Sequence, residues 1–172
     1  MGKYFGTDGV RGVAGADLTC EMAMLIGRGA AAVLTSSTGH KPRILIGKDT
    51  RQSGDMLEAA LTAGLCSVGA DVESLGVVPT PAVAYLVRKY NADAGVVISA
   101  SHNPMEFNGI KIFAGTGYKL PDDVEEEIEA HIDDKCAGIP LATGDGVGRV
   151  TCRIDGIKDY VEHLYESIGG DL

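Results

Sequence analysis

The sequence predicts an α/β fold, a three-layer α/β/α sandwich around a mixed, mostly parallel sheet. Short apolar runs rich in β-branched residues alternate with longer segments of helical periodicity, which is typical of right-handed βαβ units. Glycine accounts for 24 of the 172 residues, about twice the usual share, as many tight turns require. Two strands near residue 100 are joined by a loop too short for a crossover helix, so we expect them to be antiparallel and the sheet to be mixed.

The first part of the chain predicts two helices separated by a strand. Thr19 can cap a helix that extends from about residue 20 to residue 35. A short apolar strand follows over residues 43–47, and Ser53 can then cap the second helix. The residues expected to face the core from the two helices are Met22, Leu25, Ile26, Ala30, Val33, Leu34, Met56, Ala60, Leu61, Gly64, Leu65 and Val68.

The middle of the chain predicts three strands and one helix. Residues 71–76 are expected to form a strand. In Thr80-Pro81 a helix cap precedes a proline at the first helical position, which favours a helix to about residue 90. The two strands joined by the short loop are expected over residues 95–99 and 110–114.

An acidic helix is predicted over residues 122–134, which hold eight of the 24 acidic residues. Val124, Ile128 and Ile132 form an apolar stripe at helical spacing. We therefore expect the stripe to be buried and the acids to lie on a solvated face.

The last part of the chain is expected to lead away from this domain. Residues 137–148 are rich in Gly, Pro and Thr, which is typical of a connector. A short strand is expected over residues 148–154 and an amphipathic helix over residues 156–168. We therefore divide the chain into a first domain, residues 1–135, and a connector with a strand and a helix, residues 136–172.

Charge, hydropathy and cysteine usage argue against several classes of protein. The net charge is −9 with no basic cluster, so nucleic-acid binding is not expected. No run of about 18 apolar residues occurs and residues 1–4 lack a signal-peptide pattern, so we expect a cytoplasmic protein with no membrane partner. Cys20, Cys66, Cys136 and Cys152 are scattered, and we interpret them as reduced thiols rather than as a zinc site or a disulfide framework.

The loop between the strands at 95–99 and 110–114 carries the most chemical information. Ser101 stands next to His102, and Asn103-Pro104 favours a turn. Loops beyond the carboxyl ends of strands are where α/β sheets bind ligands, although an ordinary polar turn explains these residues about equally well. A triad hydrolase is disfavoured, because a Gly-x-Ser-x-Gly elbow is absent and adjacent residues rarely form a nucleophile–base pair.

Four segments of the chain, taken in order, carry a family resemblance. They are YFGTDGVRG at residues 4–12, GKDTRQSG at residues 47–54, GVVPTPAV at residues 76–83 and ISASHNP at residues 98–104. They resemble the opening signature, the turn after the second strand, the loop before the third helix and the phosphoserine loop of the α-D-phosphohexomutases. The first segment has the form typical of the bacterial branch that acts on glucosamine phosphates. One departure is Phe107, where that branch usually carries an acidic residue and where an aromatic ring could pack the loop.

The resemblance implies the first domain of the phosphohexomutase fold and, for the intact enzyme, an intramolecular phosphotransferase, that is, an isomerase. A phosphorylated Ser101 would pass its phosphoryl group to a hexosamine monophosphate, and a bisphosphate intermediate would return its other phosphate to the serine. Glucosamine 6-phosphate and glucosamine 1-phosphate would thus interconvert, which would supply UDP-N-acetylglucosamine for peptidoglycan. Mg²⁺ would bind the phosphate on Ser101, and hexosamine 1,6-bisphosphate would be both intermediate and activator.

The family's metal-binding Asp-Gly-Asp-x-Asp loop and its phosphate-clamping loop belong to later domains, and neither motif is found in this sequence. We therefore expect this chain to be an N-terminal domain that is inactive alone. Its expected partners are a small phosphosugar and the remaining domains of the same enzyme. The oligomeric state stays open, with a homodimer as one option.

The resemblance also implies roles for polar residues around the phosphoserine. Arg11 would bind phosphate and stabilise transferred charge, where the alternative is a surface arginine in a Gly-rich loop. Lys111 would neutralise phosphate or act as a general acid or base, where the alternative is a lysine on the solvated face of an edge strand. His102 would orient the phosphate or move a proton without being the general base, where the alternative is a hydrogen bond within its own turn. Asn103 would contact phosphate, and both Asn103 and Asn108 would tie the loop together.

The remaining polar residues of the motifs are interpreted as mostly structural. Asp49, Arg51 and Ser53 belong to a turn that a helix cap closes. Asp8 can pair with either Arg11 or Arg51, and the spacing does not choose between them.

Other functions are also consistent with the sequence. A sister enzyme acting on glucose or mannose phosphates would carry the same motifs. A phosphosugar-binding module without turnover belongs to a different class, and a serine hydrolase is a more distant third.

Overall fold

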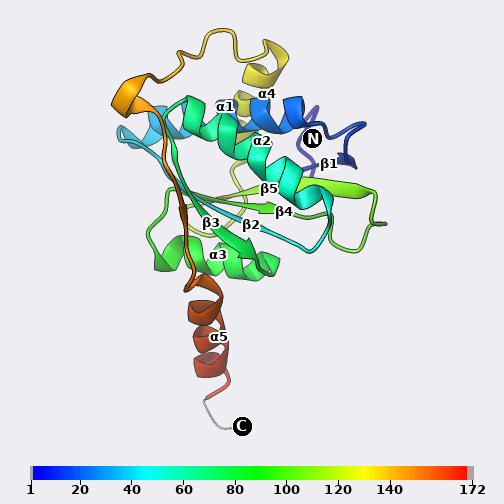
Figure 1. The fold of residues 1–172 in the computed structure, drawn as a ribbon, viewed down its shortest axis with the longest axis vertical. Helices are drawn as coiled ribbons and strands as arrows, with labels where there is room; N and C mark the ends of the chain where they lie inside the picture. The colour runs from blue at the N-terminus through cyan, green and yellow to red at the C-terminus, as the bar shows by residue number, and fades with distance from the viewer. Residues whose placement is uncertain (1, 170–172) are drawn as a thin grey trace.

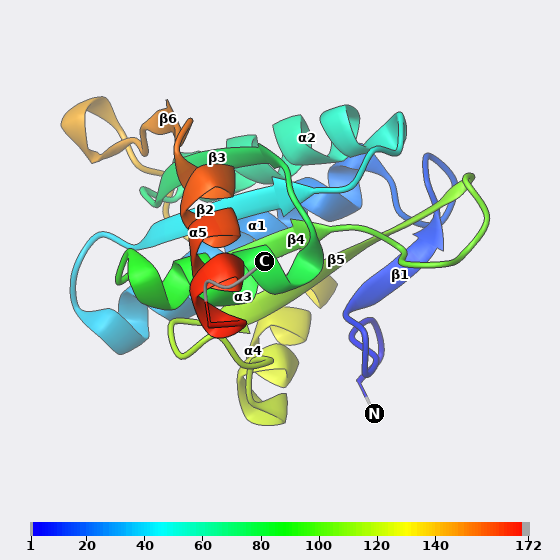
Figure 2. The ribbon, with the colours of Figure 1, turned by 90° about the horizontal axis from the view of Figure 1, so that it is seen from below.

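The structure, a computed structural model, describes residues 2–169. In this part of the chain six strands form one sheet in the order β1-β5-β4-β2-β3-β6 (Figure 2). The strands are β1 (Val10–Val13), β2 (Arg43–Lys48), β3 (Asp71–Val77), β4 (Ala94–Ile98), β5 (Phe107–Ala114) and β6 (Val150–Cys152). β2 pairs in parallel with β3 and β4, and β3 with β6, whereas β5 is antiparallel to both β1 and β4. The prediction of a mixed, mostly parallel sheet is confirmed.

Helices cover both faces of this sheet (Figure 1). On one face lie α1 (Cys20–Thr38), α2 (Ser53–Ser67) and α4 (Asp122–Asp133), and on the other lies α3 (Thr80–Lys89). α5 (Gly156–Ser167) packs against α3, and a short 3₁₀ turn occupies Gly144–Gly146. Every residue of β4 is buried, as expected for a strand with helices on both faces. The three-layer α/β/α sandwich is thereby confirmed.

Close contact between α1 and α2 builds the support beneath the sheet. A Cβ atom at Gly64 of α2 would overlap the carbonyl oxygen of Met24 in α1. Leu57, Leu61 and Leu65 of α2 are fully buried in the same core. Because the glycine has no side chain, the backbones of α1 and α2 approach closely here.

The helix starts differ from two of the three predictions. Thr19 caps α1 as predicted, since its Oγ1 accepts a hydrogen bond from the N–H of Met22 at 3.2 Å. Ser53 and Thr80, in contrast, are the first residues of α2 and α3, and neither helix has a side-chain cap. The Ser53 hydroxyl instead accepts a hydrogen bond from a residue distant in sequence, Asn108, at 2.9 Å.

The inward face of α2 also differs from the prediction at one position. Met56 is 40% exposed, whereas its neighbour Leu57 is fully buried. Leu57, Leu61, Gly64 and Leu65 follow the spacing i, i+4, i+7, i+8 of one helix face. Met56 lies about 100° around the helix from Leu57, and its side chain lines a cavity beside the loop that follows β4.

The acidic helix α4 is only partly solvated on its acidic side. Ile128 and Ile132 are buried as predicted, but so are the side chains of Glu125 and Glu129. Glu125 forms an ion pair with Lys119 at 2.6 Å, and Glu129 binds main-chain N–H groups of the N-terminal segment. The prediction of a solvated face is wrong for these two residues, because both carboxylates have partners that replace water.

The C-terminal part forms the predicted strand and helix. β6 extends the sheet as a parallel neighbour of β3, and Tyr160 is buried where α5 meets α3. The domain division at residue 135 stays a prediction. All four cysteines are free, and among the described residues no helix is both long and apolar enough to span a membrane.

Candidate active site

The residues singled out in the sequence gather beyond the carboxyl ends of two parallel strands. β2 ends at Lys48 and β4 ends at Ile98, and these strands are neighbours in the sheet. From β2 the chain proceeds to β3 on one side, and it later returns to β4 on the other side. The edge shared by β2 and β4 is therefore a topological switch point, the position where open α/β sheets bind ligands.

Ser101 lies exposed in the loop that follows β4. Its φ angle is +57°, in the left-handed region that residues other than glycine rarely adopt. Its N–H donates to the hydroxyl of Ser99 at 3.0 Å, and its Oγ lies 3.4 Å from Nδ1 of His102. The Ser101 hydroxyl is thus exposed to solvent, and the imidazole of His102 lies beside it on the loop.

A cavity of about 200 Å³ opens beside this serine. The Arg11 guanidinium lies 3.4 Å from the Asp8 carboxylate, and the Lys111 ammonium lies 3.7 Å from the same carboxylate. The residues lining the cavity are Asp8, Arg11, Thr80, Val97, Ser99, Ser101 and Lys111. Two cations from different strands therefore converge on one small cavity with the serine.

The structure decides two alternatives that the sequence left open. Asp8 pairs with Arg11 and Lys111, whereas Arg51 pairs with Asp49. Lys111 lies on β5, between β1 and β4, so the alternative of a lysine on an edge strand is wrong. Nε of Arg11 is buried, and within residues 2–169 it has no hydrogen-bond partner.

Arg11 reaches the cavity from β1, a strand that the sequence pattern does not predict. In the register of the sheet Arg11 is opposite Gly109 of β5. A Cβ atom at Gly109 would lie 2.9 Å from Cγ of Arg11 and 2.7 Å from the Ser99 carbonyl oxygen. Glycine here lets the arginine stem and the serine loop pack on β5 together. β1 was missed because four residues with a central glycine are too short for a period-2 pattern.

Glu129 anchors the N-terminal segment that leads into β1. Its carboxylate accepts hydrogen bonds from the main-chain N–H groups of Lys3 at 2.9 Å and of Tyr4 and Phe5 at 2.6 Å each. Burial by itself raises the pKa of Glu129, but the three donors outweigh burial and hold the pKa below its ordinary value. The charged carboxylate therefore supports the segment whose continuation carries Asp8 and Arg11.

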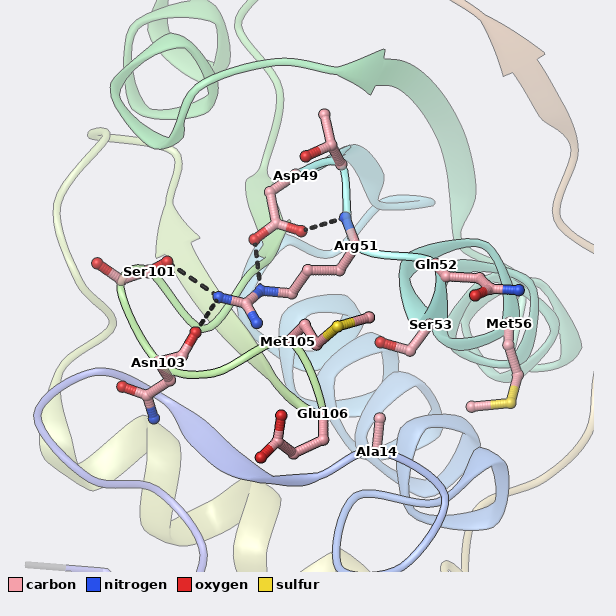
Figure 3. Close-up of a pocket in the computed structure, with 11 residues that line it drawn as sticks. Ala14, Asp49, Arg51, Gln52, Ser53, Met56, Ser101, Asn103, Met105 and Glu106 are labelled. Atoms are coloured by element: carbon pink, nitrogen blue, oxygen red, sulfur yellow. Dashed lines mark hydrogen bonds and ion pairs between the residues drawn. The ribbon is translucent and has the colours of Figure 1, made fainter.

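Arg51 connects the end of β2 to the Ser101 loop (Figure 3). Asp49 accepts hydrogen bonds from the N–H and the Nε of Arg51, both at 3.0 Å. The guanidinium then donates to four main-chain carbonyl groups of the loop. The interpretation of Asp49 and Arg51 as parts of a turn closed by a cap was incomplete, because the turn aims the arginine at the serine loop.

Two asparagines hold the ends of the same loop. Asn108 is fully buried, and its side chain donates to Ser53 Oγ at 2.9 Å and accepts from the N–H of Gly109 at 2.8 Å. The main-chain N–H of Asn103 donates to the carbonyl of Ala100 at 3.0 Å. Asn108 thus ties the loop through its side chain, as predicted, and Asn103 does so through its main chain.

A larger cavity, of about 970 Å³, also has Ser101 and Asn103 on its wall (Figure 3). It extends past Arg51 and the start of α2, where Ser53 and Met56 line it. The serine loop therefore separates a small cationic cavity from a wider and open one.

The sequence did not predict that Asp49 and Arg51 together hold the serine loop or that Glu129 holds the N-terminal segment. The only signal for the first two was the GKDTRQSG turn, in which an aspartate precedes an arginine by two residues. Glu129 carried no signal, because its partners are main-chain groups more than 120 residues away.

Comparison with known proteins gives a consistent family assignment. Residues 2–137 match the family model described as phosphoglucomutase/phosphomannomutase, alpha/beta/alpha domain I. Over 172 residues the chain is 60% identical to a phosphoglucosamine mutase of Acetivibrio thermocellus and 58% identical to one of Clostridium acetobutylicum. In both cases the alignment covers 100% of this chain and 38% of the relative, so the chain spans well under half of their length.

Solved structures show the same fold. A putative phosphomannomutase from Thermus thermophilus superposes with a TM-score of 0.78 at 28% identity. A phosphoglucomutase/phosphomannomutase family protein from Burkholderia thailandensis gives 0.77 at 27% identity. Each superposition covers 95% of this chain and 35% of the solved chain.

Proposed function

The chain belongs to the phosphoglucomutase/phosphomannomutase family, and on that premise we propose that the protein containing it interconverts glucosamine 6-phosphate and glucosamine 1-phosphate. The observation that carries the proposal is the convergence of Ser101, Arg11 and Lys111 on one cavity at the switch point of the sheet. Relatives of 58–60% identity that are named phosphoglucosamine mutase support glucosamine as the sugar. The solved structures named after mannose or glucose phosphates are only 27–28% identical.

In the proposed reaction Ser101 carries the phosphoryl group between two positions of the sugar. The bond between phosphorus and the serine oxygen breaks, the serine oxygen keeps the electron pair and gains a proton, and a free sugar hydroxyl takes the phosphoryl group and loses its own proton to a base. The resulting sugar bisphosphate then reorients within the site, so that its other phosphate faces Ser101. It then returns its other phosphoryl group to the Ser101 oxygen, so that the enzyme is regenerated and the sugar is isomerised.

Charge control is the main physical demand of this chemistry, since phosphoryl transfer spreads negative charge over the equatorial oxygens. Arg11 presents a planar fork of donors that suits phosphate oxygens, and its Nε has no hydrogen-bond partner among the residues that the structure describes. Lys111 adds a second positive charge from β5. His102, 3.4 Å from the serine oxygen, would orient the phosphate, and Asn103 would contact it.

Mg²⁺ would stabilise charge on the transferred phosphoryl group when bound. The chemistry of the donor set here fits a partial site, in which an oxygen of the phosphate on Ser101 is one ligand. Among residues 2–169 no group of three or more His, Cys, Asp or Glu side chains could hold a metal ion. The remaining metal ligands would therefore come from another part of the protein, and that part would also complete the sugar site. Hexosamine 1,6-bisphosphate would serve as the activator of the enzyme.

A mutase assay on the product of the complete gene tests the proposal. Glucosamine, glucose and mannose 6-phosphates would be compared in the presence of Mg²⁺, with Ser101→Ala as the test variant and Ser36→Ala, an exposed serine of α1, as the control. We expect a preference for glucosamine 6-phosphate that Ser101→Ala abolishes and Ser36→Ala leaves intact. Preference for glucose or mannose would reassign the substrate, and activity in Ser101→Ala would refute the phosphoserine mechanism.

A further inference from the structure

The guanidinium of Arg51 is fully occupied by protein groups. Nη1 donates to the carbonyls of Pro104 at 2.6 Å and Phe107 at 3.0 Å. Nη2 donates to the carbonyls of Ser101 at 3.0 Å and Asn103 at 2.8 Å. Nε donates to the carboxylate of Asp49 at 3.0 Å, so all five N–H donors of an arginine are used.

This occupancy separates Arg51 from the cations of the small cavity. A phosphate could bind Arg51 only by displacing a main-chain carbonyl or Asp49, and each displaced acceptor would lose a charge-assisted hydrogen bond. The side chain of Arg51 is only 12% exposed, and its charge is paired with Asp49. Arg51 is therefore poorly suited to binding substrate and well suited to holding the loop.

The loop needs such support at Ser101. Ser101 is held at a φ angle of +57°, and residues in this region persist only where their surroundings impose it. Ser101, His102 and the residues from Pro104 to Glu106 are exposed, so side-chain packing does not order them. One of the four carbonyls bound by Arg51 belongs to Ser101 itself.

We propose that Arg51 is the positioning residue that fixes the Ser101 oxygen for phosphoryl transfer, an inference that rests on the proposed role of Ser101. Asp49 orients the guanidinium, and the guanidinium ties the end of β2 to the loop after β4. The two strand ends at the switch point then move as one unit. A lysine cannot replace Arg51 in this role, because an ammonium group has three donors and no planar fork.

The test uses Arg51→Lys in the product of the complete gene. We expect kcat to fall by about 100-fold, the effect of misplacing a reacting group by roughly 1 Å, while KM for glucosamine 6-phosphate changes by less than about threefold. Hydrogen exchange at the amides of Asn103 and Phe107, which close turns inside the loop, should accelerate by at least about tenfold.

Arg43→Lys is the matched control. Arg43 lies at the opposite end of β2, donates to the carbonyl of Tyr90 and pairs with Glu73. It is thus a partly buried arginine with one main-chain acceptor and one carboxylate partner, away from the serine loop. We expect Arg43→Lys to leave kcat and the exchange of the loop amides within about twofold of the natural protein, even if it lowers the unfolding temperature.

The outcomes separate this inference from the proposed function. If Ser101→Ala abolishes turnover and Arg51→Lys leaves kcat unchanged, the inference is wrong and the mechanism stands. A raised KM with unchanged kcat in Arg51→Lys would show substrate binding and would also overturn it. Activity in Ser101→Ala would remove the mechanism and the inference together. If Arg51→Lys fails to fold, Asp49→Asn replaces it as the test variant. This change weakens the hydrogen bond from Arg51 Nε to residue 49, and we expect it to lower kcat by about tenfold. An unchanged kcat, or a raised KM with unchanged kcat, would again overturn the inference.

Discussion

Replacing Glu129 with glutamine is expected to detach the N-terminal segment from α4 without unfolding the sheet. The natural carboxylate accepts three main-chain hydrogen bonds, two at Oε1 and one at Oε2. In the amide one oxygen can still serve Tyr4 and Phe5, but the NH₂ group would face the N–H of Lys3. A hydrogen bond to a charged group contributes about 1.5–3 kcal/mol. Losing one such bond and weakening two predicts a loss of about 2–4 kcal/mol in the free energy of unfolding.

The pH dependence gives this prediction a sign. The pKa of Glu129 lies below its ordinary value in the folded protein, so its contribution is present above the pKa of the unfolded chain, near 4.3. The contribution is lost as the pH falls through the folded pKa. The stability difference between the natural protein and Glu129→Gln should therefore be largest at pH 6–7 and should shrink as the pH approaches 3.

Urea unfolding at several pH values, followed by hydrogen exchange at Tyr4 and Phe5, measures both effects. Glu127→Gln is the control, because it removes the same charge from an exposed position of the same helix and is expected to change stability by less than about 0.5 kcal/mol. A difference between natural protein and Glu129→Gln that stays constant from pH 7 to pH 3 would refute the role assigned to the carboxylate. An equal loss in Glu127→Gln would attribute the effect to helix charge instead.

Two further predictions concern helix packing and the cationic cavity. Gly64→Ala should destabilise the chain by about 1–3 kcal/mol through overpacking against Met24. Gly54→Ala is the control in the same helix, because the nearest atom to its new Cβ would be 3.4 Å away, and it should be neutral or stabilising by up to about 1 kcal/mol. Thermal unfolding measures both variants, and equal effects would contradict the close contact between the helices. Lys111→Met should lower turnover by the full gene product at least about 100-fold and change the free energy of unfolding by less than about 1 kcal/mol, since its ion pair is partly exposed. Turnover within threefold of the natural protein would exclude Lys111 from the site.

Local patterns predicted most elements of the fold. The alternation of β-branched runs with helical stripes predicted five of the six strands in the described part of the chain and the positions of the helices, because core-facing residues must repeat with the period of the element. Thr19 was predicted correctly as a cap, since capping involves only residues within one turn. Ser53 and Thr80 were not, because a hydroxyl can take another partner and a helix can start without a cap.

In the candidate site too, features set by neighbouring residues were predictable and features set by distant residues were not. Ser101 and His102 are adjacent, so their chemistry was visible in the sequence, as was the Asp49 turn that leads to Arg51. The distances that make a site were not visible. The pairing of Asp8 with Lys111 and the bonds from Arg51 to four carbonyls join residues that lie roughly 50 or more positions apart in the chain.

The sequence by itself determined the fold class, the reactive loop and the family motifs, because each is encoded within a window of about ten residues. Only the tertiary structure decided that the opening segment forms β1, that β5 is an interior strand and that Glu129 anchors the N-terminal segment. It also decided that the Arg51 guanidinium donates to carbonyl groups of the serine loop. The physical reason is that a side chain's role depends on which donors and acceptors remain free after folding, and those partners are distant in the chain.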